Sequence, residues 1–153
     1  MSTFNEKIKT RIENLDTPEK CEIMFKNCMA KGCSDLANLA RTQAIKLRAD
    51  SHNPQSPIER ELLQAAYAYQ EVLQLKHGKK ILAVRTWQLI KKYGIVRAAE
   101  KAIDRPDQTQ GYESLKTFGL EGHSFESVVT RHPGAFSPGA VEISKARILN
   151  AKN

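Results

Sequence analysis

The chain has 153 residues, and its 24 Lys and Arg residues exceed its 17 Asp and Glu residues, which gives a formal net charge of +7. This length can bury a hydrophobic core without covalent staples, and an odd number of cysteines, three, argues against a disulfide framework. No apolar run is long enough to span a bilayer, and no secretory signal begins the chain. The totals therefore exclude membrane-spanning and disulfide-rich secreted classes, and we expect a cytoplasmic protein with no membrane partner.

Capping residues divide the first fifty residues into three expected helices. Thr17 followed by Pro18 is typical of an N-cap and a first helical turn, and Gly32 is typical of a helix C-terminus. A third helix is expected to run to about Ala49, before a loop rich in Ser, Asn and Pro. We interpret residues 1–153 as a single helical domain, with residues 1–52 as a candidate N-terminal helical subdomain.

Residues 56–78 predict the longest helix of the chain. Ser56, Pro57 and Glu59 form a capping-box pattern with proline in the first turn. No helix breaker follows until Gly78, and the apolar stripe in between is the longest in the sequence. We expect this helix to be the central element of the core.

The segment from Lys76 to Arg105 concentrates the basic charge of the chain. It holds nine Lys or Arg residues and only two acidic ones, so its formal charge of +7 equals that of the whole chain. Residues 81–93 predict one helix, whose apolar surface includes Leu82 and Trp87, and residues 95–103 predict a second helix after a break at Gly94. We expect Trp87 to pack in the core. If the lysines of these helices only solvate an exposed face, Tyr93 is expected in the core as well.

The composition changes in the last third of the chain. Glycines recur between short segments, and Ser124 and Ser137 are plausible caps of two of them. No stretch alternates with a period of two for long enough to predict a strand. The fold class predicted is all-α, a compact multi-helix bundle with short capped helices in the C-terminal third.

No metal, cofactor or catalytic constellation is predicted. Cys21 and Cys28 share an apolar helical face, which favours buried thiols, and the spacing to Cys33 matches no common zinc pattern. The four histidines lack both an HExxH pattern and an i, i+4 pair. A hydrolase that uses Asp104, Asp107 or His132 ranks below the binding functions.

Two resemblances are visible in the sequence. The run GIVRAAEKAI within residues 86–105 resembles the Gly-x-x-x-Ala-Ala entry of helix-turn-helix proteins, although the following DRPDQTQGY departs from that motif. The runs RTWQLIKKYGIVRAAEKAI, GYESLKTFGL and SFESVVTRHPGAFSPGAV together resemble a group of small uncharacterised bacterial proteins, from about Thr17 onwards. That second resemblance implies a bacterial or phage origin and assigns no functional residue.

The predicted function is non-enzymatic nucleic-acid binding through the basic helix–Gly–helix segment. DNA is favoured over RNA because no aromatic platform for stacking bases is visible, and regulation, restriction or defence would be suitable settings. The alternative is an adaptor or inhibitor that binds an acidic protein surface, with Trp87 or Tyr112 as an apolar anchor. The expected phosphate-binding residues are Lys79, Lys80, Arg85, Lys91, Lys92, Arg97, Lys101 and Arg105.

Overall fold

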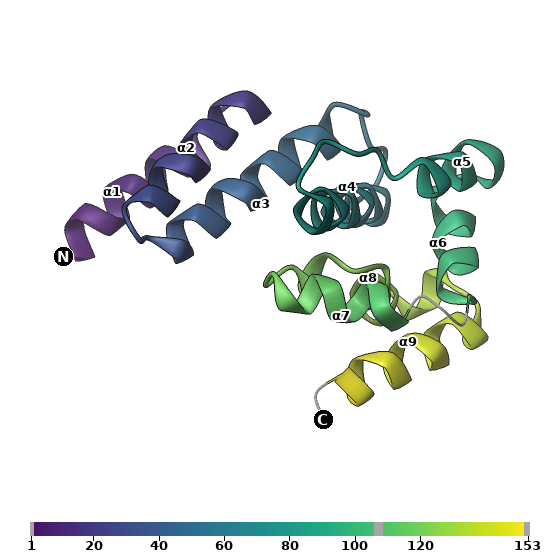
Figure 1. Ribbon diagram of the computed structural model, residues 1–153. Helices are drawn as coiled ribbons and strands as arrows, with labels where there is room; N and C mark the ends of the chain where they lie inside the picture. The colour runs from purple at the N-terminus through teal and green to yellow at the C-terminus, as the bar shows by residue number, and fades with distance from the viewer. Residues whose placement is uncertain (1, 106–108, 152–153) are drawn as a thin grey trace. The chain divides into compact units, whose positions relative to one another are not determined.

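The computed structural model describes residues 2–105 and 109–151, and over these ranges its regular elements are all helical (Figure 1). The all-α prediction is confirmed. The chain divides into two compact units, residues 1–53 and residues 54–153. None of the helices in the described ranges is long and apolar enough to cross a membrane.

The N-terminal unit contains helices α1 (Ser2–Glu13), α2 (Pro18–Ala30) and α3 (Ser34–Asp50). Helices α2 and α3 form an antiparallel hairpin around Gly32, whose φ of 73° lies in the left-handed region that favours glycine. Alanines at 37, 40 and 44 recur on the buried face of α3, and such small side chains allow close packing of helices.

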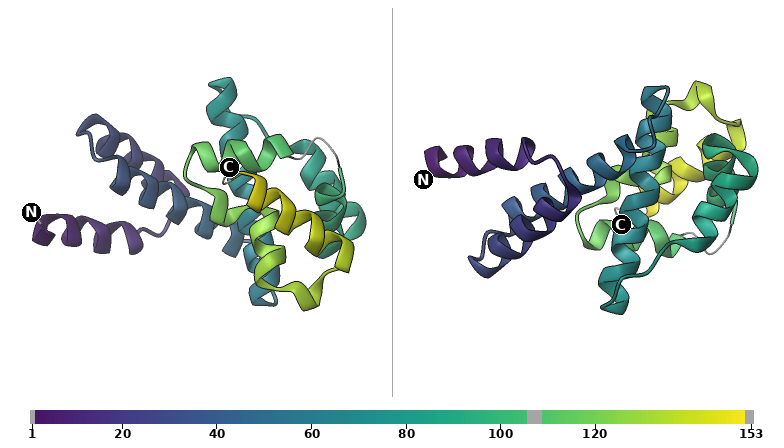
Figure 2. Two further views of the ribbon diagram at one scale, coloured as in Figure 1. Left: turned by 90° about the horizontal axis from the view of Figure 1, so that it is seen from below. Right: turned by 90° about the horizontal axis from the view of Figure 1, so that it is seen from above.

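The C-terminal unit is built around α4 (Pro57–His77). It continues with α5 (Val84–Tyr93), α6 (Ile95–Ile103), α7 (Thr109–Thr117), α8 (Phe125–Arg131) and α9 (Pro138–Ala151). Two short 3₁₀ turns, η2 (Glu121–His123) and η3 (Pro133–Ala135), flank α8. Helices α6, α7 and α8 contact α4, and α9 packs on α6, α7 and α8 (Figures 1 and 2).

One hydrophobic core holds this unit together. Leu62 of α4 and Ile103 of α6 are almost completely buried, as are Val128 and Val129 of α8. The alanines of α6, Ala98, Ala99 and Ala102, are buried too. One face of α6 is buried in this core. A ligand can therefore contact α6 only on the opposite, exposed face.

The capping predictions agree with the observed hydrogen bonds. The side chains of Thr17, Ser56, Ser124 and Ser137 each accept a bond from the backbone N–H three residues later, at 3.0–3.2 Å. Gly78 ends α4 in the left-handed conformation expected for it. Local sequence signals thus fix these helix ends.

Residues 81–83 are not helical, which corrects the expected helix over 81–93. The Nε2 amide of Gln74 donates to the Ile81 carbonyl at 3.1 Å, and the Ala83 N–H donates to Oε1 of Gln70 at 3.0 Å. These bonds from α4 take backbone groups of the connection, so α5 begins only at Val84. Leu82, between them, is 66% exposed instead of adding to a buried helical stripe.

Candidate nucleic-acid interface

Helix α5 presents a continuous basic face to solvent. This face consists of the exposed residues Val84, Arg85, Gln88, Lys91 and Lys92, and their spacing of one, four, seven and eight residues from Val84 places them on a single side; the exposed Tyr93 lies off this side. The helix carries three cations and no acidic residue. It lies at the outer edge of the C-terminal unit (Figures 1 and 2).

The cations of this face and of the preceding connection have few competitors for an anion. Over residues 2–105 and 109–151, no ion pair or side-chain hydrogen bond is formed by Lys79, Lys80, Arg85 or Lys91. Lys92 lies 5.2 Å from the ring centroid of Tyr93 and forms no ion pair in the same ranges. We call Lys79, Lys80, Arg85, Lys91 and Lys92 the α5 basic face.

A buried glutamine attaches α5 to the body of the unit. Oε1 of Gln70 accepts hydrogen bonds from the Ala83 N–H and from Nε1 of Trp87, at 3.0 and 2.9 Å. The Trp87 ring also packs against Tyr67 of α4, with ring centroids 4.9 Å apart. Trp87 is therefore half-buried, and both its ring and its N–H are engaged within the fold.

Tyr93 departs from its expected place in the core. It is 40% exposed, and Nζ of Lys101 lies 4.3 Å from its ring centroid. This cation–π contact joins the exposed face of α6 to the C-terminal end of α5. Lys91 and Lys92 in the last turn of α5 also interact favourably with the helix dipole.

The cations of α6 are less available than those of α5. Nη1 of Arg97 lies 3.4 Å from a carboxylate oxygen of Glu100, and Lys101 covers Tyr93. Asp104, which is exposed, adds a second negative charge beside them. The positive charge of the predicted phosphate-binding residues Arg97 and Lys101 is thus partly offset by acidic residues of the same segment.

Glu100 also joins α6 to α9. Its carboxylate accepts a 2.7 Å hydrogen bond from the Ser137 N–H, one residue before α9 begins. That bond, helped by Arg97, lowers the pKa of Glu100 against the opposing effect of burial. An acidic residue in α6 therefore has a structural role at the N-terminus of α9.

Arg105 is placed at the end of α6 by a contact with α9. The guanidinium of Arg147 donates to the Arg105 carbonyl at 2.7 Å and to the Glu126 carboxylate at 3.1 Å. Arg105 itself is half-buried. Seven of the eight predicted cations lie between Gly78 and the end of α6, and Arg105 lies two residues beyond it. Within the described ranges, the five cations of the α5 basic face are exposed and form no ion pair.

His132, one of the candidate catalytic residues, belongs to a cluster with Glu61 and Arg131. Nε2 of His132 lies 2.5 Å from Glu61, and Nε of Arg131 donates to the other Glu61 oxygen at 2.8 Å. Burial opposes ionisation of Glu61, but these two partners outweigh it and lower its pKa. The three side chains bind α8 to α4, far along the chain from Asp104, and Asp107 lies outside the described residues.

Metal ligation finds no support either. Within the described ranges, no group of three or more His, Cys, Asp or Glu side chains is arranged to hold a metal ion. Cys21 and Cys28 are buried, as predicted, and burial raises the pKa of both thiols. A raised pKa disfavours the thiolate that would ligate a metal or act as a nucleophile.

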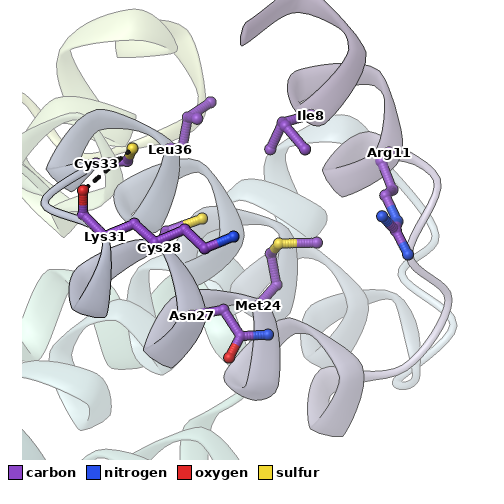
Figure 3. A pocket seen from close by; sticks show the side chains of 8 residues that line it. All are labelled: Ile8, Arg11, Met24, Asn27, Cys28, Lys31, Cys33 and Leu36. Atoms are coloured by element: carbon purple, nitrogen blue, oxygen red, sulfur yellow. Dashed lines mark hydrogen bonds between the residues drawn. The ribbon is translucent and has the colours of Figure 1, made fainter. Parts of the chain in front are cut away.

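The N-terminal unit has a pocket of about 170 Å³ at its hairpin end. Figure 3 shows Ile8 and Arg11 of α1 on one side and Met24, Asn27 and Cys28 of α2 on another. The thiol of Cys33 is turned to the Lys31 carbonyl, 3.8 Å away. The polar residues that line the pocket are exposed or half-buried. The pocket therefore lacks the buried polar groups that orient a ligand.

Some residues of the interface gave no signal in the sequence. Nothing in the sequence distinguishes Gln70 from other polar residues of α4, yet it positions both Ala83 and Trp87. Tyr112, a candidate exposed anchor, is only 6% exposed and belongs to the core. Leu82 and Val84, at 66% and 56% exposure, are the apolar side chains beside the cations.

Comparisons with the sequence profiles of known protein families, with curated proteins and with solved structures find no match for this chain.

Proposed function

We propose that this protein binds duplex DNA through the α5 basic face, without a cofactor and without catalysis. The observation that carries the proposal is a helix whose solvent side holds three cations, no acid and no internal ion pair, preceded by two further exposed lysines. Cations that are not neutralised internally can release counterions from a polyanion, which is the main source of phosphate-backbone affinity.

Duplex DNA is favoured over single strands because the aromatic rings near the interface are already packed against other side chains. Base stacking requires an open aromatic face, but Trp87 packs on Tyr67 and Tyr93 is covered by Lys101. Contacts from α5 would therefore go to phosphates. Arg97 pairs with Glu100 and Lys101 covers Tyr93, so neither side chain is free to bond to base edges. This further favours contacts to the DNA backbone.

Salt dependence tests this proposal. For four phosphate contacts, affinity for duplex DNA should fall about 100-fold between about 50 and 200 mM salt. Changing Lys79, Lys80, Arg85 and Lys91 to Gln should weaken binding at low salt and flatten the dependence. Undetectable binding of the unaltered protein at low salt would exclude this function.

A matched control separates local from overall charge. Lys7, Lys9, Lys26 and Lys46 are exposed cations of the N-terminal unit, and changing these four to Gln removes the same net charge. The control variant should bind DNA within about 3-fold of the unaltered protein, because the proposal assigns the phosphate contacts to the α5 basic face. Equal losses in the two variants would mean that no specific surface is used.

One observation favours a second function, an adaptor for an acidic protein surface. Leu82 and Val84 are exposed apolar side chains beside the cations, an arrangement that also suits a protein interface. Trp87 and Tyr112 do not serve as anchors, since the fold engages both. Capture of one acidic protein after nuclease treatment, abolished by Leu82→Ser, would support this alternative.

A further inference from the structure

The exposed apolar residues of the interface lie inside a stretch without negative charge. Leu82 is 66% exposed and Val84 is 56% exposed, and both are flanked by Lys79, Lys80 and Arg85. Between Glu71 and Glu100 the chain has no acidic residue. Any partner that covers Leu82 must therefore also accept a dense positive surface, which points to a polyanion.

The backbone on both sides of Leu82 is held by α4. Gln74 bonds the Ile81 carbonyl at 3.1 Å, and Gln70 bonds the Ala83 N–H at 3.0 Å. Ala83 is buried and Ile81 is half-buried, so the chain is anchored immediately before and after the exposed leucine. Leu82 is thereby presented to solvent with little conformational freedom left to lose on binding.

We propose that Leu82 acts as a wedge that enters a base-pair step from the minor groove and kinks the bound duplex. This inference depends on the proposed DNA-binding function and deepens it. An apolar side chain offers no hydrogen-bond code to the major groove, whereas minor-groove proteins insert Leu, Ile or Phe between base pairs. The flanking cations hold the phosphates on either side of the opened step, and Val84 covers its edge.

The wedge predicts a bent and locally unstacked DNA. We would measure energy transfer between dyes at the ends of a duplex of about 30 base pairs, and the fluorescence of 2-aminopurine at flexible TA steps. The unaltered protein should raise both signals on saturation. Leu82→Ala should remove at least half of each signal while affinity falls by less than about 10-fold, because phosphate contacts dominate affinity.

A leucine of the same exposure provides the control. Leu149 of α9 is 64% exposed and lies outside the α5 basic face, so Leu149→Ala should leave bending and affinity unchanged. Both leucines are on the surface, and neither substitution should lower the thermal unfolding midpoint by more than about 2 °C.

The possible failures are distinguishable. If the unaltered protein binds DNA with salt dependence but neither bends it nor raises the 2-aminopurine signal, the wedge is wrong and DNA binding stands. If the unaltered protein does not bind DNA, the proposed function fails and the wedge with it. If Leu82→Ala bends DNA as before but loses an acidic protein partner, Leu82 is a protein anchor and the wedge is overturned.

Discussion

Glu126 and Arg147 form a buried ion pair in the C-terminal unit. Their side chains are 7% and 10% exposed, and Nη1 of Arg147 lies 3.1 Å from the carboxylate. Burial raises the pKa of Glu126, and the backbone and Arg147 offset this only in part. The carboxylate thus depends on a single cation for its charge to be tolerated in the core.

Removal of Arg147 should destabilise the fold in a pH-dependent way. In Arg147→Met the buried carboxylate has no cation, so the free energy of unfolding should fall by about 3–5 kcal/mol at pH 8. Because the folded-state pKa of Glu126 lies above its unfolded value, this loss is present above the folded pKa and shrinks as the pH falls through it. Urea unfolding at pH 8 and pH 5 measures the difference.

Glu126→Gln is the matched control for this prediction. The amide keeps the shape of the side chain and an acceptor for Arg147, which still donates to the Arg105 carbonyl. Its cost should be smaller and should not shrink toward pH 5. Equal, pH-independent losses in both variants would show that packing, and not charge, makes the pair important.

At the scale of the element, Gly94 determines how α5 is joined to α6. Its φ of 83° and ψ of 163° fall in a region that is essentially restricted to glycine. Apart from Gly94 and its two neighbours in the chain, no heavy atom lies within 4 Å of the place where a Cβ would stand, so any effect of a side chain there comes from backbone strain. The joint lets α5 end and α6 begin with a single residue between them.

Gly94→Ala should therefore cost about 1–3 kcal/mol of folding free energy. If the strain is relieved by a shift of α5, the α5 basic face also moves, and DNA affinity should fall with stability. Gly139→Ala, at a helical position of α9 with equally open space, should be neutral or slightly stabilising. A neutral Gly94→Ala would mean that the helices meet at a different angle.

Sequence signals predict elements well where the cause is local and poorly where it is distant. The helix ends at Ser56, Gly78 and Gly94 follow from capping chemistry within a few residues. The late start of α5 does not, because it depends on Gln70 and Gln74, seven or more residues upstream.

The same contrast holds for the candidate interface. Its position in the chain follows from composition, since the charge of residues 76–105 is visible in the sequence. Which cations remain free follows only in part. The Arg97–Glu100 pair is a local i, i+3 contact within α6, but Tyr93 engages Lys101 only once α5 and α6 have folded against each other. The role of Glu61, whose partners lie 70 and 71 residues away, is equally invisible beforehand.

At the scale of the molecule, the proposed interface lies in one of two compact units. Every residue of the α5 basic face, and the hydrophobic core that supports it, lies within residues 54–153. The N-terminal unit of 53 residues is near the lower size at which a hydrophobic core suffices without staples or partners.

A chain that begins at Pro54 should therefore fold and bind DNA. We expect it to keep its helical circular dichroism and a cooperative thermal transition, with affinity for duplex DNA within about 3-fold of the full chain at equal salt. Residues 1–53 alone should show weaker helicity and no salt-dependent binding.

Two outcomes would contradict this prediction. If the chain that begins at Pro54 is folded but no longer binds DNA, the N-terminal unit supplies phosphate contacts, and cations such as Lys7, Lys9 and Lys46 become the residues to substitute next. If the chain is unfolded, the core of residues 54–153 is not sufficient by itself, and the DNA affinities of the point variants in the full chain decide where binding takes place.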